Sequence, residues 1–357
     1  MKHHIITLFL LLVATEGFCD SIPCNFKMSD GSMLQGTVIT PQDKNLRKMV
    51  IIVNHRDKTP EGSGQAYSYL IDKLSARGIS VCYYMNRPAL KEDLTFTTLF
   101  DMADDAVSVY NSLKSNKLFQ KYKIGFIGAS EEAESSLIAA SKVPDPAFLI
   151  QMVGCVIPQY KLDLQTFTIN SPQLSLRITD ATGMSFHDYS VIIQEVFDYC
   201  ITHQKIDKNA LVQQLVKKHG DKATRMKEFF PTIIQVLIDR ITAPQQGVVP
   251  RLHWDSKPYY RRVKCPILFL TATDDRNVLC YPNLFEFEKI MSENHHKHYT
   301  TVLVDATHDL LTVSESRKLH HAYGNDINFS KRERVFDLVC KWLFTVTYKF
   351  NKQPAKK

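Results

Sequence analysis

Three kinds of side chain that together could carry out nucleophilic catalysis follow apolar, strand-like segments of the sequence. Ser130 comes after one such segment, the pair Asp274 and Asp275 after a second, and His308 after a third. A histidine can take the proton from a serine hydroxyl, and a carboxylate can hold the imidazole in the tautomer that this transfer requires. The order of the three, and their placement after strands, therefore predict an activated serine nucleophile.

Each of these residues also has a more common structural role. A serine before a helix is usually an N-cap, an Asp-Asp pair after a strand is usually a turn, and a single histidine in a loop is usually solvated. The spacing favours the catalytic interpretation, because the 33 residues from Asp275 to His308 (308 − 275) leave room for one helix and one strand. We therefore expect the three positions to meet at one edge of a sheet.

Apolar runs alternate with stretches of helical spacing along most of the chain. Strands are expected near 25–28, 33–39, 49–53, 79–84, 123–127, 148–153, 266–271 and 300–304, and helices near 67–77, 100–117, 130–142, 284–291 and 331–345. Strands separated by helices of this length predict a mainly parallel sheet with right-handed crossovers. Enzymes with such sheets place their chemistry at the carboxyl ends of the strands, which is where the serine, aspartates and histidine are expected.

The alternation stops between residues 158 and 264, where no buried strand is evident and apolar residues recur at helical spacing. We interpret 158–264 as an inserted helical cap. The sheet domain would then consist of two parts, 20–157 and 265–348, followed by a basic tail at 349–357. We expect the cap to influence what enters the site.

Residues 1–19 have the features of a secretory signal peptide. Lys2 precedes an apolar run at 5–14 that is short for a membrane span, and small residues permit cleavage after Gly17 or Cys19. No later segment approaches the roughly 20 apolar residues that a membrane span requires. The sequence thus predicts an exported protein, periplasmic or secreted, with no stable membrane span once the signal peptide is removed.

The composition argues against several other classes of protein. The net charge of +7 is spread along the chain without a basic stripe interleaved with aromatic residues, so nucleic-acid binding is not expected. The eight cysteines include no CxxC pair, and His295, His296 and His298 have no partner at metal-ligand spacing, so no metal site is predicted. No glycine-rich phosphate loop is evident in the sequence, so no nucleotide cofactor is implied.

Five segments of the sequence carry a family resemblance. They are SDGSMLQGTVITP, LIDKLSARGISVCYYMNR, FDMADDAVSVYNSLKS, KIGFIGASEE and HWDSKPYYRRVKCPILFL. They resemble the α/β-hydrolase superfamily, in particular exported bacterial acyl-hydrolases of the serine-aminopeptidase and dienelactone-hydrolase-like kind. The resemblance spans roughly residues 25–345 apart from the cap, and it implies an α/β fold with a mostly parallel central sheet, flanked by helices, and a helical cap inserted before the last core strands. Position by position, Ser130 matches the nucleophile, Asp275 the acid and His308 the base, while Asp274 falls one place early and is the fallback acid.

Two stretches depart from the pattern of that family. The loop NHRDKTPEGSG carries His55 and Arg56 where the family has glycines that lend a backbone N–H to the oxyanion hole, and the second N–H would come from Glu131. At the serine, the G-H-S-E-G-G of the family is replaced by G-A-S-E-E-A, which puts Glu132 and Ala133 in place of two glycines. Glu132 is expected to crowd the serine turn unless neighbouring positions make room.

Two functions of different classes remain open on these residues. The first is hydrolysis of an ester or other acyl bond in a small-molecule substrate through an acyl-enzyme on Ser130, with a serine-aminopeptidase-like peptidase as a variant of the same chemistry. The second is a binding protein that keeps the hydrolase fold with an impaired oxyanion hole. The complete set of serine, aspartate and histidine favours hydrolysis, and the missing glycines favour binding.

Overall fold

An eight-stranded sheet forms the centre of the protein, which is described here from a computed structural model. The structure describes residues 19–53, 67–85, 99–165, 168, 172–203, 206–231, 233–234, 254–323 and 332–350. The strands lie in the order β1-β2-β4-β3-β5-β6-β7-β8. They are β1 (Cys19–Lys27), β2 (Met33–Pro41), β3 (Lys48–Ile52), β4 (Ile79–Tyr84), β5 (Lys123–Ala129), β6 (Leu149–Met152), β7 (Ile267–Ala272) and β8 (Tyr299–Val304).

Most of the sheet is parallel. Strands β1 and β2 form an antiparallel hairpin at one edge, β2 also pairs antiparallel with β4, and every remaining pair is parallel. The predicted hairpin is present, but β1 begins at Cys19, which pairs with Pro41, rather than near residue 25. The earlier start escapes sequence analysis because β1 is an edge strand whose first residues are largely exposed, so they lack an apolar run.

The side chains of the central strands divide between two hydrophobic cores, one on each face of the sheet. Along β7, Ile267 and Phe269 belong to one core, and Leu268 and Leu270 belong to the other. Successive side chains of a strand point to opposite faces, so a strand that is covered on both sides needs apolar residues at every position. This explains the continuous apolar runs of the sequence.

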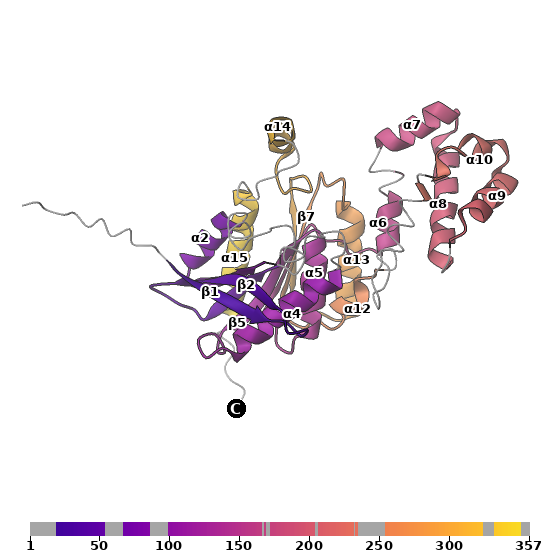
Figure 1. The fold of residues 1–357 in the computed structure, drawn as a ribbon. Coiled ribbons are helices and arrows are strands. Elements are labelled where there is room, and N and C mark those ends of the chain that lie inside the picture. The colour runs from indigo at the N-terminus through magenta and orange to yellow at the C-terminus, as the bar shows by residue number, and fades with distance from the viewer. Residues whose placement is uncertain are drawn as a thin grey trace, which may run out of the picture.

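Helices cover both faces of this sheet (Figure 1). They are α2 (Ser68–Ser75), α4 (Leu99–Ser115), α5 (Glu131–Lys142), α6 (Gln159–Gln165), α7 (Pro172–Thr182), α8 (Phe186–Thr202), α9 (Lys208–His219), α10 (Asp221–Arg225), α12 (Lys257–Tyr260), α13 (Cys280–Glu293), α14 (Val313–Tyr323) and α15 (Glu333–Phe350). The apolar sides of α2 and α15 pack on one face, and those of α4, α5 and α13 on the other. The predicted fold class, a mostly parallel sheet flanked by helices, is confirmed. Helix α14 was not predicted, because the apolar residues of VSESRKLHHAY are too few to show a helical stripe.

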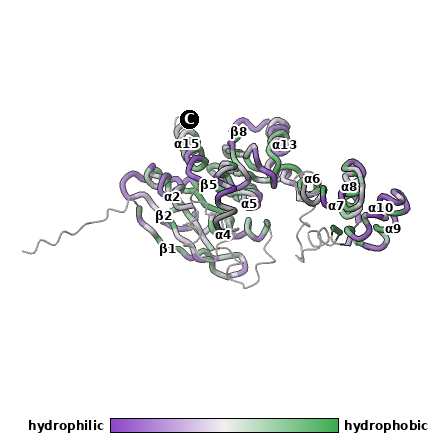
Figure 2. The backbone as a smooth tube through the Cα atoms, turned by 90° about the horizontal axis from the view of Figure 1, so that it is seen from above, coloured by the Kyte–Doolittle hydropathy of each residue, from purple (hydrophilic) through white to green (hydrophobic). Residues whose placement is uncertain are grey.

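Helices α6 to α10 occupy the stretch of chain between β6 and β7. Figures 1 and 2 show α7 to α10 to one side of the sheet, beyond α6. Tyr189, Phe197 and Phe230 belong to a third core that these helices build among themselves. The boundaries at 158 and 264 and the role of a cap stay predictions, and residues 235–253 lie outside the described part. Among the helices of the described residues, none combines the length and apolar character needed to cross a membrane.

Candidate active site

The turn after β5 holds Ser130 in a strained backbone conformation. Ser130 has a φ of 55° and a ψ of −123°, a region that residues with a side chain rarely occupy. Its backbone N–H donates a hydrogen bond of 2.8 Å to the carbonyl oxygen of Met152, at the end of β6. Its hydroxyl makes no capping hydrogen bond to α5, so the interpretation of Ser130 as an ordinary N-cap is wrong. A positive φ at this point is typical of a serine presented on a sharp strand-to-helix turn.

Two glycines make room for this turn. A Cβ atom on Gly128 would lie 2.1 Å from the backbone oxygen of Glu132, and one on Gly154 would lie 2.7 Å from the Cβ atom of Ala133. The first turn of α5 therefore packs against bare backbone at both places. The contact at Gly154 shows how the chain tolerates Ala133 where the related pattern has a glycine, since the space for its methyl group comes from the facing residue.

We expect Gly128→Ala to lower the free energy of unfolding by about 3 kcal/mol, because the added methyl group would overlap backbone atoms that no side-chain rotation can move. Urea unfolding followed by circular dichroism measures this loss. The control is Ser141→Ala in the last turn of the same helix, where the hydroxyl donates only to the Ile138 carbonyl oxygen. Equal unfolding midpoints for Gly128→Ala and the wild type would contradict the close packing of this turn.

Asp275 lies in the loop after β7 with its carboxylate enclosed. The side chain is 0% exposed, and Oδ1 accepts the backbone N–H groups of Asn277 and Val278, both at 2.8 Å. These two hydrogen bonds fix the carboxylate so that Oδ2 faces His308. The fallback acid, Asp274, is exposed to solvent. The structure therefore distinguishes the two neighbouring aspartates by their burial.

His308 lies in a tight loop after β8. The backbone N–H and the hydroxyl of Thr307 both donate to the carbonyl oxygen of Leu311, at 2.8 and 3.3 Å. The N–H of Leu310 donates back to the carbonyl oxygen of Thr307 at 2.9 Å, and Leu310 has a φ of 62°. This closed loop directs the imidazole toward the ends of β5 and β7, where its side chain is 18% exposed.

The three side chains form one continuous chain of hydrogen bonds. Nε2 of His308 lies 2.9 Å from Oγ of Ser130, and Nδ1 of His308 lies 2.8 Å from Oδ2 of Asp275. When Nδ1 carries the proton and donates it to Asp275, Nε2 presents a lone pair that can accept the proton of Ser130. The structure thus brings together the serine, the histidine and the preferred acid, in the geometry that a general base needs beside a nucleophile.

A buried cation lies near the acidic residue that follows the serine turn. Arg332, just before α15, is 4% exposed. Burial lowers the pKa of its guanidinium to about 10, and the nearby Tyr67, Asp309 and Glu132 act in the opposite direction. Opposite charges in a poorly solvated region attract strongly, so Arg332 offsets the charge of Glu132. No local sequence pattern indicates that Arg332 lies near Glu132, because 200 positions (332 − 132) separate the two.

The candidate oxyanion hole lies partly within the described residues. Glu131 is the first residue of α5 and directly follows Ser130. Backbone N–H groups in the first turn of a helix have no acceptor within that helix, and the helix dipole favours negative charge there. His55 and Arg56 lie outside the described residues, so their part in the hole stays a prediction.

The clustered histidines lie away from the serine, between α13 and β8. His296 is buried and its Nδ1 accepts the backbone N–H of His298 at 3.3 Å. Burial lowers the pKa of the His296 imidazole, and the neighbouring His298 and Lys264 lower it further. Within the described part of the chain, no three histidine, cysteine, aspartate or glutamate side chains gather so that they could hold a metal ion.

Comparison with known proteins supports the fold. No family model and no curated protein sequence matches the chain. Among solved structures, an acylaminoacyl peptidase of Pyrococcus horikoshii matches with a TM-score of 0.51 at 12% identity, over 92% of this chain and 41% of the peptidase. An orthorhombic crystal form of that peptidase gives a TM-score of 0.50 at 12% identity, over 92% and 42%. The chain has the α/β-hydrolase fold. At this identity the match shows the fold alone, and the chain spans less than half the length of the peptidase.

Some other solved structures match with TM-scores below 0.5. A dienelactone hydrolase of Anabaena variabilis matches with a TM-score of 0.48 at 11% identity, over 92% of this chain and 99% of that protein. With TM-scores below 0.5, such matches add nothing to the assignment. In an α/β-hydrolase fold, the residues that follow β5, β7 and β8 meet at one edge of the sheet. In this chain those residues are Ser130, Asp275 and His308.

Proposed function

We propose that this protein is a serine hydrolase that cleaves an ester or another acyl bond. The hydrogen-bonded chain of Ser130, His308 and Asp275 carries the proposal. Oγ of Ser130 would attack the acyl carbon while Nε2 of His308 takes its proton. The tetrahedral intermediate would then collapse to an acyl-enzyme as His308 passes that proton to the leaving group. Water, activated by the same imidazole, would release the acid and restore the serine.

The oxyanion of each tetrahedral intermediate requires donors next to Ser130. We assign the backbone N–H of Glu131 as one donor, because of its place at the start of α5. The second donor would come from the loop that carries His55 and Arg56. Each such donor typically contributes about 10²- to 10³-fold to kcat. We favour an ester over a peptide as substrate, since the acyl-enzyme mechanism does not by itself supply recognition of a peptide chain.

We also propose that the protein is exported. The predicted signal peptide, residues 1–19, lies outside the described residues except for Cys19, at which β1 begins. Cleavage after Gly17 would leave this strand whole, whereas cleavage after Cys19 would remove its first residue. N-terminal sequencing of protein recovered from the exported fraction is therefore expected to begin at Phe18. Recovery of the chain with its first residues intact would contradict export by this signal.

Labelling with a fluorophosphonate, which reacts with activated serines, tests the proposed function directly. We expect one label per chain, and none on Ser130→Ala or His308→Ala, because the first lacks the nucleophile and the second lacks its base. Ser141→Ala serves as the matched control and should label like the wild type. A folded wild type that takes no label between pH 6 and 9 would overturn the hydrolase proposal and leave a binding protein on a hydrolase frame.

A further inference from the structure

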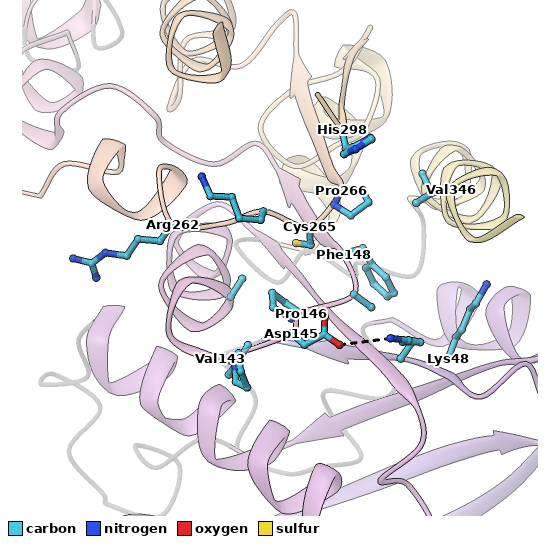
Figure 3. Close-up of a pocket in the computed structure, with 15 residues that line it drawn as sticks. Lys48, Val143, Asp145, Pro146, Phe148, Arg262, Cys265, Pro266, His298 and Val346 are labelled. Atoms are coloured by element: carbon cyan, nitrogen blue, oxygen red, sulfur yellow. Dashed lines mark ion pairs between the residues drawn. The ribbon is translucent and has the colours of Figure 1, made fainter. Parts of the chain in front are cut away.

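A pocket of about 460 Å³ opens at the edge of the sheet opposite Ser130 (Figure 3). It lies at the N-terminal ends of the parallel strands, and both Lys48, which begins β3, and Lys123, which begins β5, line it. Its volume is in the range of small-molecule sites, about 300–1,000 Å³. The pocket is separate from the candidate active site, so binding there would be independent of the proposed function.

The side chains that line this pocket carry an excess of positive charge. The basic residues among them are Lys48, Lys123, Arg262, Lys264 and His298. Asp145 is the one carboxylate among the described residues of the lining, and it lies 3.5 Å from the ammonium group of Lys123 (dashed line in Figure 3). A single carboxylate therefore faces four permanent cations, which makes the pocket attractive to anions.

Lys48 differs from the other basic residues of the pocket. It is only 8% exposed, whereas Lys123, Arg262, Lys264 and His298 are all exposed. Within the described part of the chain, its ammonium group has no carboxylate or hydrogen-bond acceptor in reach. Burial lowers the pKa of this ammonium group. A partly buried cation without a counter-charge is less stable than a fully hydrated one, and a bound anion would relieve that cost.

The remainder of the lining is apolar. Pro146, Ala147 and Val346 are partly exposed there, beside the buried Phe148 and Val143. Figure 3 shows Phe148 and Pro266 between Lys48 and His298. Such a surface gains free energy by covering hydrocarbon or aromatic groups. An inorganic ion would leave this surface in water, and a neutral molecule would leave Lys48 without a counter-charge.

We propose that this pocket binds an organic anion, namely a carboxylate or phosphate carried on an apolar body. The charged group lies at the ammonium group of Lys48, and the body covers the partly exposed apolar residues Pro146, Ala147 and Val346. Lys123 and Lys264 at the exposed rim attract the ligand. The site is distinct from the serine and needs no chemical step.

Fluorescence titration of the full chain with 1-anilinonaphthalene-8-sulfonate, an aromatic anion, tests this proposal. N-phenyl-1-naphthylamine, which has the same rings without the sulfonate, is the neutral counterpart. We expect Lys48→Met to lower the affinity for the anionic probe about tenfold, because only the anion can pair with the ammonium group. The affinity for the neutral probe should stay unchanged. The control is Lys289→Met, an exposed lysine of α13, which should alter neither affinity. Equal affinity of the wild type and Lys48→Met for the anion would overturn the proposal.

Octyl phosphate and octanoate, added as competitors, distinguish the two kinds of charged group. Displacement of the fluorescent anion by either supports the site, and the stronger competitor identifies the group. Displacement by neither would reject an organic anion as the ligand.

Thermal unfolding gives a second measurement on the same variants. Without ligand, Lys48→Met should raise Tm slightly, because it removes an unpaired, partly buried charge. The stronger competitor should then raise the Tm of the wild type but not of Lys48→Met. Equal ligand-induced shifts in both proteins would also count against the site. Lys264→Met, at the exposed rim, leaves the core intact, so it serves as a second variant if Lys48→Met fails to fold. It should lower the affinity for the anionic probe roughly threefold.

Discussion

Replacing His308 with alanine is expected to lower kcat for ester hydrolysis about 10⁶-fold, because Ser130 loses the base that takes its proton and the acid that protonates the leaving group. The imidazole lies 2.9 Å from Oγ of Ser130 and contacts the reacting atoms rather than the rest of a substrate. KM should therefore change little. Steady-state hydrolysis of p-nitrophenyl acetate, and of esters with longer acyl chains, measures both constants.

His187→Ala is the matched control for this experiment. His187 is an exposed residue of α8, and its loss should leave kcat unchanged. A folded His308→Ala variant that kept more than a tenth of the wild-type kcat would show that another group serves as base. Circular dichroism and the urea midpoint of each variant establish that a loss of activity is not a loss of fold.

Replacing Asp275 with asparagine is expected to lower kcat about 10⁴-fold. An asparagine can keep the Oδ1 contacts to the N–H groups of Asn277 and Val278, so the loop after β7 should hold its shape. Its Nδ2 would then donate to Nδ1 of His308, which places the imidazole proton on Nε2. That nitrogen could no longer accept the proton of Ser130.

Asp274→Asn is the discriminating control for Asp275→Asn. Asp274 is exposed, and His308 is hydrogen-bonded to Asp275 and not to Asp274. The kcat of Asp274→Asn should therefore stay within about threefold of the wild type. The same ester assay serves for both variants. A larger loss from Asp274→Asn than from Asp275→Asn would reverse the assignment of the acid.

The sheet could be predicted because its central strands are covered on both faces. Residues such as Ile267 to Leu270 alternate between two cores, and this requirement produces the continuous apolar runs that mark β3, β5, β6 and β7. Where one side of an element is open to water the signal fades, as at the start of β1 and along α14. Apolar patterning reports burial, so exposed elements are the ones it misses.

The residue types of the site could be predicted, and the contacts that shape it could not. Ser130, Asp275 and His308 each follow a recognisable strand, so a parallel topology is enough to bring them together. The room around the serine depends on Gly154, and the charge next to it is offset by Arg332. Those contacts join residues that are distant in sequence, and no local pattern indicates them.

The pairing of β6 with β7 joins Leu149 to Ile267 across 118 positions of the chain (267 − 149). During synthesis, β6 is therefore complete well before its partner exists. At ribosomal rates the interval is on the order of ten seconds. Throughout it, β6, whose four residues are all buried in the finished sheet, is an open apolar edge that can pair with another chain. The helices made meanwhile build their core from nearby residues and can fold first. The yield of native protein should thus depend on how well the unpaired edge of β6 is protected from other chains until β7 is made. It should depend only weakly on the stability of the completed fold.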